Sequence, residues 1–158
     1  MSTLIDAGKV VGKWSGRNLL WLGPEEPVRE SAAEVTVAAA AANGFLVLTY
    51  SWSDQGKPHD GVLMARTAAE TDHMAMVWVD SFHTMGKFMR FEGRPTTDGS
   101  VEATTRWSIG DGPDWGWRIV LSCPSADELL VRMYVATPEG EEAPAVEARY
   151  ERGAARGT

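Results

Sequence analysis

The chain has 158 residues, of which 44% are hydrophobic, and a formal net charge of −7. This length fits a single domain over residues 1–158, and the hydrophobic fraction is that of a globular protein rather than a disordered one. An acidic surface repels phosphate backbones, and the sequence has no basic cluster and no apolar run long enough to span a bilayer, so we expect neither a nucleic-acid partner nor a membrane partner. The N-terminus lacks the apolar run of a signal peptide, which predicts a cytoplasmic protein.

The sequence has few residues that could bind a metal ion or form a disulfide. Cys123 is the only cysteine, which excludes an intramolecular disulfide and a cysteine-based zinc site. The three histidines, His59, His73 and His83, show no metal-ligand spacing such as His-x-His. We therefore expect no metal site and no cofactor, and we interpret Cys123 as a small core residue.

Alternation of apolar and polar residues dominates the chain. A lead-in over residues 1–11 has room for a helical turn or two before Gly12, and the tail at 153–158 is expected to fray. Between them, period-two alternation bounded by turn signals predicts about ten strands. The expected strands are residues 13–22, 33–39, 45–52, 62–67, 73–82, 85–92, 101–107, 115–122, 129–135 and 146–150.

Two connections carry specific turn signals. Asn43-Gly44 predicts a type I′ hairpin turn, because both residues accept positive φ angles. The segment "SDQGKPHDG" at residues 53–61 is rich in turn-forming residues and predicts a longer turn.

Ten antiparallel strands joined by short connections favour an all-β, up-and-down barrel with little helix. Closing the barrel removes the two exposed sheet edges. A β-sandwich is the alternative, but its crossovers usually need longer connections. Barrels of about eight strands already hold one small ligand, so ten strands predict a lumen at least as wide. Trp14, near the start of the first strand, is expected to plug the base of the barrel.

The opening "GKWSG" at residues 12–16 is similar to the start of calycin barrels, the group of lipocalins, fatty-acid-binding proteins and nitrobindins. Together with "NGFLVLTYS", "GKPHDG" and "VWVDS", it resembles the bacterial family known as domain of unknown function 1579, over about residues 11–152. The resemblance implies a lipocalin-like barrel and no assigned activity. Nitrobindin-like barrels hold haem through a histidine near the last strand; "AVEARYERG" has none, so haem binding by that route is not expected.

The strand expected at residues 73–82 is apolar on both faces. Met74, Met76 and Trp78 lie on one side, and Ala75, Val77 and Val79 on the other. A strand that is apolar on both faces needs a cover outside the barrel. In a small protein another subunit can supply it, so we expect a homodimer.

The stretch "VWVDSFHTMGK" at residues 77–87 combines several groups that can support chemistry. Trp78 and Asp80 share a strand face, whereas Ser81 points to the opposite one, which speaks against a serine nucleophile paired with Asp80. A carboxyl group beside Trp78 in an apolar lumen would have a raised pKa. Asp80 and His83 are therefore candidates for acid–base catalysis; alternatively, Asp80 accepts backbone N–H groups at the strand end.

Three functions remain open from the sequence. The favoured one is binding of a small apolar or aromatic molecule in the barrel lumen. A lipocalin-like enzyme that transfers protons through Asp80 or His83 is the alternative, and a structural or protein-interaction barrel with a filled lumen is the third. The candidate ligand-binding residues are Trp52, His59, Trp78, Asp80, His83, Trp107 and Trp117.

Overall fold

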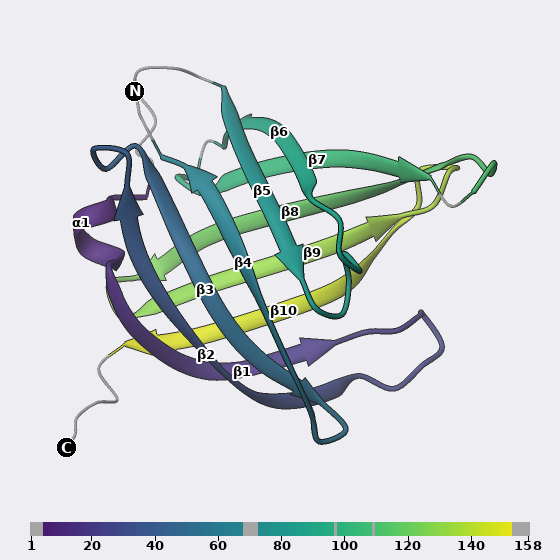
Figure 1. The fold of residues 1–158 in the computed structure, drawn as a ribbon, viewed down its shortest axis with the longest axis horizontal. Coiled ribbons are helices and arrows are strands. Elements are labelled where there is room, and N and C mark those ends of the chain that lie inside the picture. Colours follow the sequence, from purple (N-terminus) through teal and green to yellow (C-terminus); the bar gives the residue numbers. More distant parts are fainter. Residues whose placement is uncertain (1–4, 68–72, 97, 109, 153–158) are drawn as a thin grey trace.

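A computed structural model describes residues 5–67, 73–96, 98–108 and 110–152 (Figure 1). The described residues form ten antiparallel strands in a closed barrel with the order β1-β10-β9-β8-β7-β6-β5-β4-β3-β2, so the up-and-down barrel predicted from the sequence is confirmed. The tail at 153–158 lies outside the described residues. The elements are α1 (Ala7–Val10), β1 (Gly12–Leu20), β2 (Arg29–Ala40), β3 (Phe45–Asp54), β4 (Lys57–Arg66), β5 (Met74–Asp80), β6 (Met89–Pro95), β7 (Val101–Ser108), β8 (Asp114–Ser125), β9 (Glu128–Ala136) and β10 (Glu142–Arg152).

One end of the barrel is closed by α1 and Trp14. The Asp6 carboxylate accepts a hydrogen bond from the Gly8 N–H at 2.9 Å, which caps the short helix. The Trp14 indole donates to the Val10 carbonyl at 2.9 Å, and the Arg152 guanidinium lies 4.1 Å from the centre of the indole ring. Trp14 is 3% exposed, so it plugs the base as expected. The described residues contain no helix long and apolar enough to cross a membrane.

Both predicted turns differ from the structure. The chain turns at Gln55 and Gly56, whose φ angles of 52° and 84° fit a two-residue type I′ hairpin. Strand β4 therefore begins at Lys57, and the longer turn predicted over residues 53–61 is wrong. The hairpin predicted at Asn43-Gly44 is present between β2 and β3, but its type I′ turn is wrong: four residues, 41–44, link the strands, and positive φ angles fall at Ala41, Ala42 and Asn43 but not at Gly44.

The β5–β6 connection is longer than predicted. Strand β6 begins at Met89 rather than at residue 85. The Asp80 carboxylate accepts the backbone N–H groups of Phe82 and His83, which bends the chain away from an extended path. Met85 then adopts a φ of 54°, which an extended strand does not allow.

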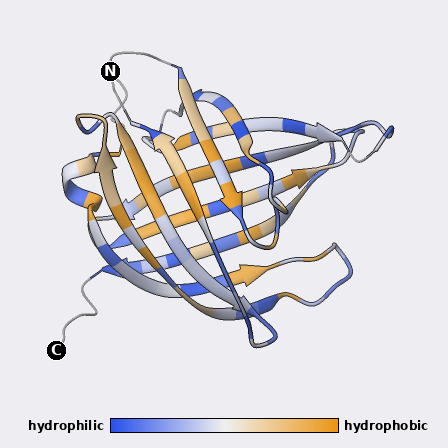
Figure 2. Cartoon of the chain, in the orientation of Figure 1, coloured by the Kyte–Doolittle hydropathy of each residue, from blue (hydrophilic) through white to orange (hydrophobic). Residues whose placement is uncertain are grey.

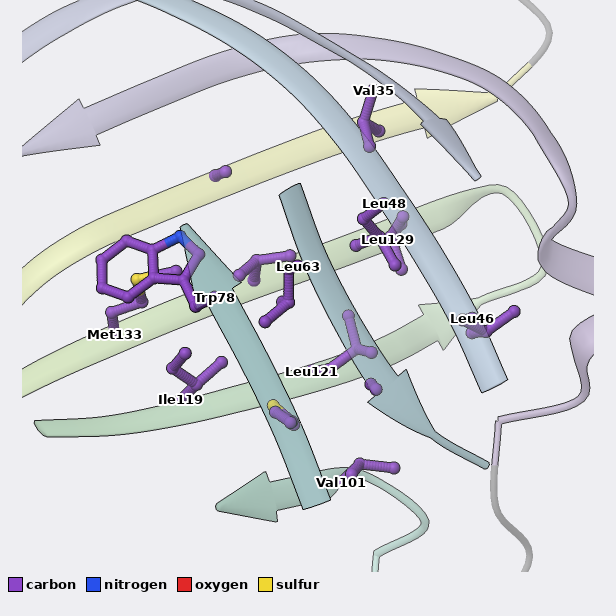
Figure 3. Close-up of a cluster of buried hydrophobic side chains, with 14 of the residues drawn as sticks. Val35, Leu46, Leu48, Leu63, Trp78, Val101, Ile119, Leu121, Leu129 and Met133 are labelled. Atoms are coloured by element: carbon purple, nitrogen blue, oxygen red, sulfur yellow. The ribbon is translucent and has the colours of Figure 1, made fainter. Parts of the chain in front are cut away.

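The core lies inside the barrel. Along β5, Met74, Met76, Trp78 and Asp80 are buried, alternating with more exposed residues, as the period of a strand requires. Figure 3 shows Trp78 beside Met133, with other apolar side chains gathered between the strands. Apolar residues concentrate along the strands, and hydrophilic residues in the connections (Figure 2).

One end of the barrel is open, and we call this end the mouth. A gap between two strands begins there. Strands β6 and β7 pair only over residues 92–95 and 101–104. Towards the mouth, β7 continues to Ser108 against β8, whereas the start of β6 pairs with β5, so that β6 and β7 part (Figure 1). We call this gap, between residues 89–91 and 105–108, the seam.

The outer face of β5 is partly exposed in the single chain. Val77 is 36% exposed and lies opposite Met64 of β4, which is 38% exposed. The homodimer that the two-faced strand predicts stays a prediction. If this face is the interface, Val77→Glu places a charge in it and dissociates the dimer. Sedimentation equilibrium should show a dimer for the native chain and a monomer for Val77→Glu.

Val28→Glu is the matched control, because Val28 is 47% exposed on a different part of the surface. It should leave the dimer intact. A native chain that sediments as a monomer at micromolar concentration contradicts the prediction.

Candidate functional site at the barrel mouth

A row of three residues across β3, β4 and β5 forms the base of the site. Tyr50 lies opposite Gly61, and Gly61 lies opposite Asp80. Neighbouring strands lie about 4.8 Å apart, so one whole strand separates Tyr50 from Asp80. Gly61 has no side chain, and the Tyr50 phenol reaches across it to donate a hydrogen bond to Asp80 Oδ2 at 2.6 Å. A Cβ atom at Gly61 would overlap the Tyr50 hydroxyl.

The Asp80 carboxylate is the centre of a hydrogen-bond network. Oδ2 accepts from the Tyr50 hydroxyl and, at 3.4 Å, from the Trp52 indole. Oδ1 accepts the backbone N–H groups of Phe82 at 2.7 Å and His83 at 2.8 Å. The Trp78 indole in turn donates to the Tyr50 oxygen at 2.6 Å. Both carboxylate oxygens are therefore satisfied by donors inside the protein, as a buried charge requires.

The ionisation of Asp80 differs from the sequence-based expectation. Burial pushes the pKa of Asp80 up, but hydrogen bonds and charge from His83, and the hydrogen bond from Tyr50, outweigh burial and lower the pKa to about 2. The expectation of a raised pKa considered only the apolar neighbours. Asp80 is an ionised acceptor, which is the alternative role that the sequence left open.

Tyr50 is held in its neutral form. Its pKa lies well above the usual value of 10 because burial and the Asp80 charge both oppose ionisation. A neutral phenol can donate to Asp80 and accept from Trp78 at the same time. Tyr50 thus connects a charged group on β5 with the aromatic wall of the lumen.

His83 lies between the network and the aromatic rings of the mouth. Its Nδ1 is 3.3 Å from Asp80 Oδ1, and its side chain is 14% exposed. The centre of the imidazole ring lies 5.4 Å from that of Trp78 and 5.6 Å from that of Trp117. The rings of Trp78 and Trp117 stack with their centres 5.5 Å apart. Asp80 therefore fixes the position of a histidine that forms part of an aromatic wall.

His59 and Trp52 form a second layer behind this wall. The His59 ring stacks on Trp52 at 4.9 Å, and Trp52 stacks on His83 at 5.8 Å. Ser81 points away from Asp80, as expected, and its hydroxyl lies 3.0 Å from His59 Nδ1. In the described part of the chain no carboxylate orients His59, so this pair does not form a catalytic triad.

A groove of about 740 Å³ opens at the mouth and runs along the seam. Its volume is in the range of small-molecule pockets. The β5–β6 connection forms one wall and contributes Met85 and Phe88, which are 81% and 83% exposed. The apolar and aromatic lining consists of Trp78, Phe82, Phe88, Met89, Trp107 and Trp117.

Two hydrogen-bond donors at this groove have no acceptor. Among the described residues, the indole nitrogens of Trp107 and Trp117 are buried and unbonded. A buried donor without a partner costs about 1–3 kcal/mol. Such unbonded donors are uncommon in a folded core.

The interior below the mouth is almost filled. A cavity of about 20 Å³ lies between the base network and the far wall, bordered by Asn18, Tyr50, Asp80 and Tyr150. This is room for about one water molecule. Side chains thus occupy most of the wide lumen that the strand number predicted.

The structure groups most of the candidate residues. Trp78, His83, Trp107 and Trp117 line the groove, whereas Trp52 and Asp80 border the small inner cavity and His59 packs behind them. Within the described residues, no group of three or more His, Cys, Asp and Glu side chains is placed to hold a metal ion. Sequence reasoning missed Tyr50, Gly61 and Phe88. Gly61 fell in the turn predicted over residues 53–61, so the signal that a glycine inside a strand gives, a close approach, was hidden by the wrong start of β4.

The chain is similar to known proteins in two comparisons. A family model described as "Protein of unknown function (DUF1579)" matches residues 8–152. The S-type phycobiliprotein lyase CPES from Guillardia theta has a similar structure, with a TM-score of 0.60 and 13% identity over 95% of this chain and 92% of the lyase. A designed fluorescence-activating β-barrel has a TM-score of 0.51 and 15% identity over 95% of this chain and 100% of the design. At these identities the likeness concerns the fold alone. No curated protein matches the chain.

Gly61→Ala tests the base of the site. The added methyl group would collide with the Tyr50 hydroxyl and the Val79 carbonyl, so Tyr50 must leave Asp80. We expect the free energy of unfolding to fall by about 1–3 kcal/mol. Gly23→Ala is the control, because a methyl group there meets only Glu26, at an ordinary 3.7 Å. Equal effects of the two substitutions in urea denaturation contradict this role for Gly61.

Asp80→Asn tests the ionised carboxylate. The pKa of Asp80 is lowered from 3.8 to about 2 in the folded protein, so its contribution to stability is present above pH 3.8 and is lost as the pH falls through 2. The native protein should have a higher free energy of unfolding than Asp80→Asn at pH 6. We expect this difference to be smaller by roughly 2 kcal/mol at pH 2.

Urea denaturation at a series of pH values measures this difference, and Asp111→Asn, at an exposed residue, is the control. A gap between native protein and Asp80→Asn that stays constant from pH 6 to pH 2 would show that Asp80 is not the group responsible.

Proposed function

The chain belongs to the DUF1579 family, whose function is unknown, and from that premise we propose that it is a lipocalin-like binding protein for a small apolar or aromatic molecule. The single observation that carries the proposal is the groove of about 740 Å³ at the mouth, lined by three tryptophans and closed on one side by Phe88 and Met85. Large apolar side chains that remain 83% and 81% exposed, at the edge of a groove, are typical of a ligand site.

The ligand position that fits best is the mouth rather than the deep lumen. The inner cavity of about 20 Å³ does not admit an organic molecule. Trp117 lies at the floor of the groove, with the buried Trp78 stacked behind it at a distance of 5.5 Å between ring centres, and a flat ring can lie against Trp117. Covering about 200 Å² of apolar surface contributes about 5 kcal/mol to the binding free energy. The cost of ordering the ligand and the β5–β6 connection is subtracted from this value.

The fold neighbours support the same class of function. One is named a phycobiliprotein lyase and the other a fluorescence-activating barrel. Because both proteins are at most 15% identical to this chain, they are consistent with a binding function for this fold and identify no ligand.

Proton transfer by His83 is a second candidate function. His83 borders the groove, and Asp80 lies behind it at 3.3 Å, which is the arrangement of a base and its orienting carboxylate. Asp80 itself does not line the groove. If a reaction occurs, His83→Gln abolishes turnover while binding persists; if the protein only binds, the substitution changes affinity alone.

A panel of polycyclic aromatics, fatty acids and tetrapyrroles, followed by intrinsic tryptophan fluorescence, tests the proposal. We expect aromatic members to change the emission of the protein. For the best binder, Trp117→Leu should raise the Kd about tenfold or more, because it removes one face of the stacking site. Isothermal titration calorimetry measures this change without depending on the tryptophan signal.

Trp21→Leu is the matched control, since Trp21 is not a lining residue of the groove. It should leave the Kd unchanged. Unaltered fluorescence across the whole panel would instead favour a structural or protein-interaction barrel, and equal effects of the two substitutions would place the ligand elsewhere.

A further inference from the structure

The charges around the groove are opposite in sign to those of the whole protein. The chain carries 22 acidic and 15 basic residues. Three residues that line the groove are cationic, namely Lys87, Arg90 and Arg106, and none of its described lining residues is Asp or Glu. In a protein with a net charge of −7, a groove with basic side chains alone indicates a preference for anions.

These cations have few partners within the chain. Arg90 lies 3.4 Å from Glu92, and both side chains are more than half exposed. In the described part of the chain, Lys87 and Arg106 form no ion pair. Asp114 lies opposite Ser108 in the β7–β8 register, yet it does not line the groove. Two of the three cations are therefore available to an anion held between them.

The cations come from both sides of the seam. Lys87 lies on the β5–β6 connection and Arg90 at the start of β6, whereas Arg106 lies on β7. An anion at the rim can contact cations from either side while an apolar ring lies against Trp117 below. The unbonded indole N–H groups of Trp107 and Trp117 are closed off from solvent, so an acceptor reaches them only after a ring moves. Lys87 and Arg106 are thus the groups available to recognise an anion.

We propose that the molecule bound at the mouth is an aromatic carboxylate, with its ring against Trp117 and its carboxylate between Lys87 and Arg106. This inference rests on the proposed function and narrows it to a chemical class. Burial of the ring supplies most of the affinity, and the cations distinguish the acid from a neutral analogue of the same shape.

Two probes that share one ring system test this class. Pyrenebutyrate carries a carboxylate at neutral pH, and pyrenebutanol carries a hydroxyl at the same position. We expect the native protein to bind pyrenebutyrate about tenfold more tightly, and we expect this preference to shrink as salt is added. Pyrene fluorescence and calorimetry both report the Kd.

A double substitution identifies the cations. Lys87→Gln with Arg106→Gln should abolish the preference for pyrenebutyrate and leave the Kd of pyrenebutanol within about twofold. Lys13→Gln with Arg17→Gln is the matched control, because it removes the same charge from β1, away from the groove. The control should keep the tenfold preference.

The outcomes separate the two proposals. If the native protein binds both probes with equal affinity, the binding function stands and the carboxylate class is wrong. If both double variants lose the preference equally, net charge explains it and the assignment to Lys87 and Arg106 is wrong. If neither probe binds, nor any member of the aromatic panel, the proposed function itself fails, and the carboxylate inference fails with it.

Discussion

The buried carboxylate of Asp80 is the constraint on which the mouth depends. An ionised group this deep must be satisfied by hydrogen bonds, and two parts of the chain supply them. Tyr50 and Trp52 come from β3, and the backbone N–H groups of Phe82 and His83 come from the following connection. The same bonds end β5, turn the chain and set His83 against Trp78 and Trp117. A single polar group thus determines both the shape of the connection and the order of the aromatic wall.

The groove follows from where the strands stop pairing. Since the β5–β6 connection bends away after Asp80, β6 meets β7 over only four positions, and the seam opens between them. At the other end, α1 and Trp14 plug the lumen, and a second hollow of about 960 Å³ lies outside them, beside Lys9, Arg132 and Arg152. The mouth is distinguished by its apolar lining, and the two most exposed of the large apolar side chains in the described residues, Met85 and Phe88, lie there.

Much of the fold could be predicted from local patterns. Alternation along β5 correctly placed Trp78 and Asp80 on the lumen face, because a strand has a fixed period of two. The ends of the strands were harder to predict from this alternation. The start of β6 depends on hydrogen bonds from the Asp80 side chain, and the start of β4 on a tight turn at Gln55 and Gly56 that pattern alone did not distinguish from a longer loop.

The site depends on contacts between strands, which a single sequence does not display. Tyr50 and Asp80 are 30 residues apart and meet only because Gly61 lies between them in register. The pKa of Asp80 was misjudged for the same reason: its apolar neighbours were visible along the strand, but its donors were not. The filled lumen likewise reflects side-chain volume in three dimensions rather than the number of strands.

Nuclear magnetic resonance of the seven tryptophan indole N–H groups is the most direct measurement of the central claim, that the ligand binds at the mouth. Titration with pyrenebutyrate should shift the signals of Trp78, Trp107 and Trp117, which line the groove, and leave Trp14 at the closed end unchanged. A titration that shifts Trp14 while the three groove signals stay in place would contradict the account.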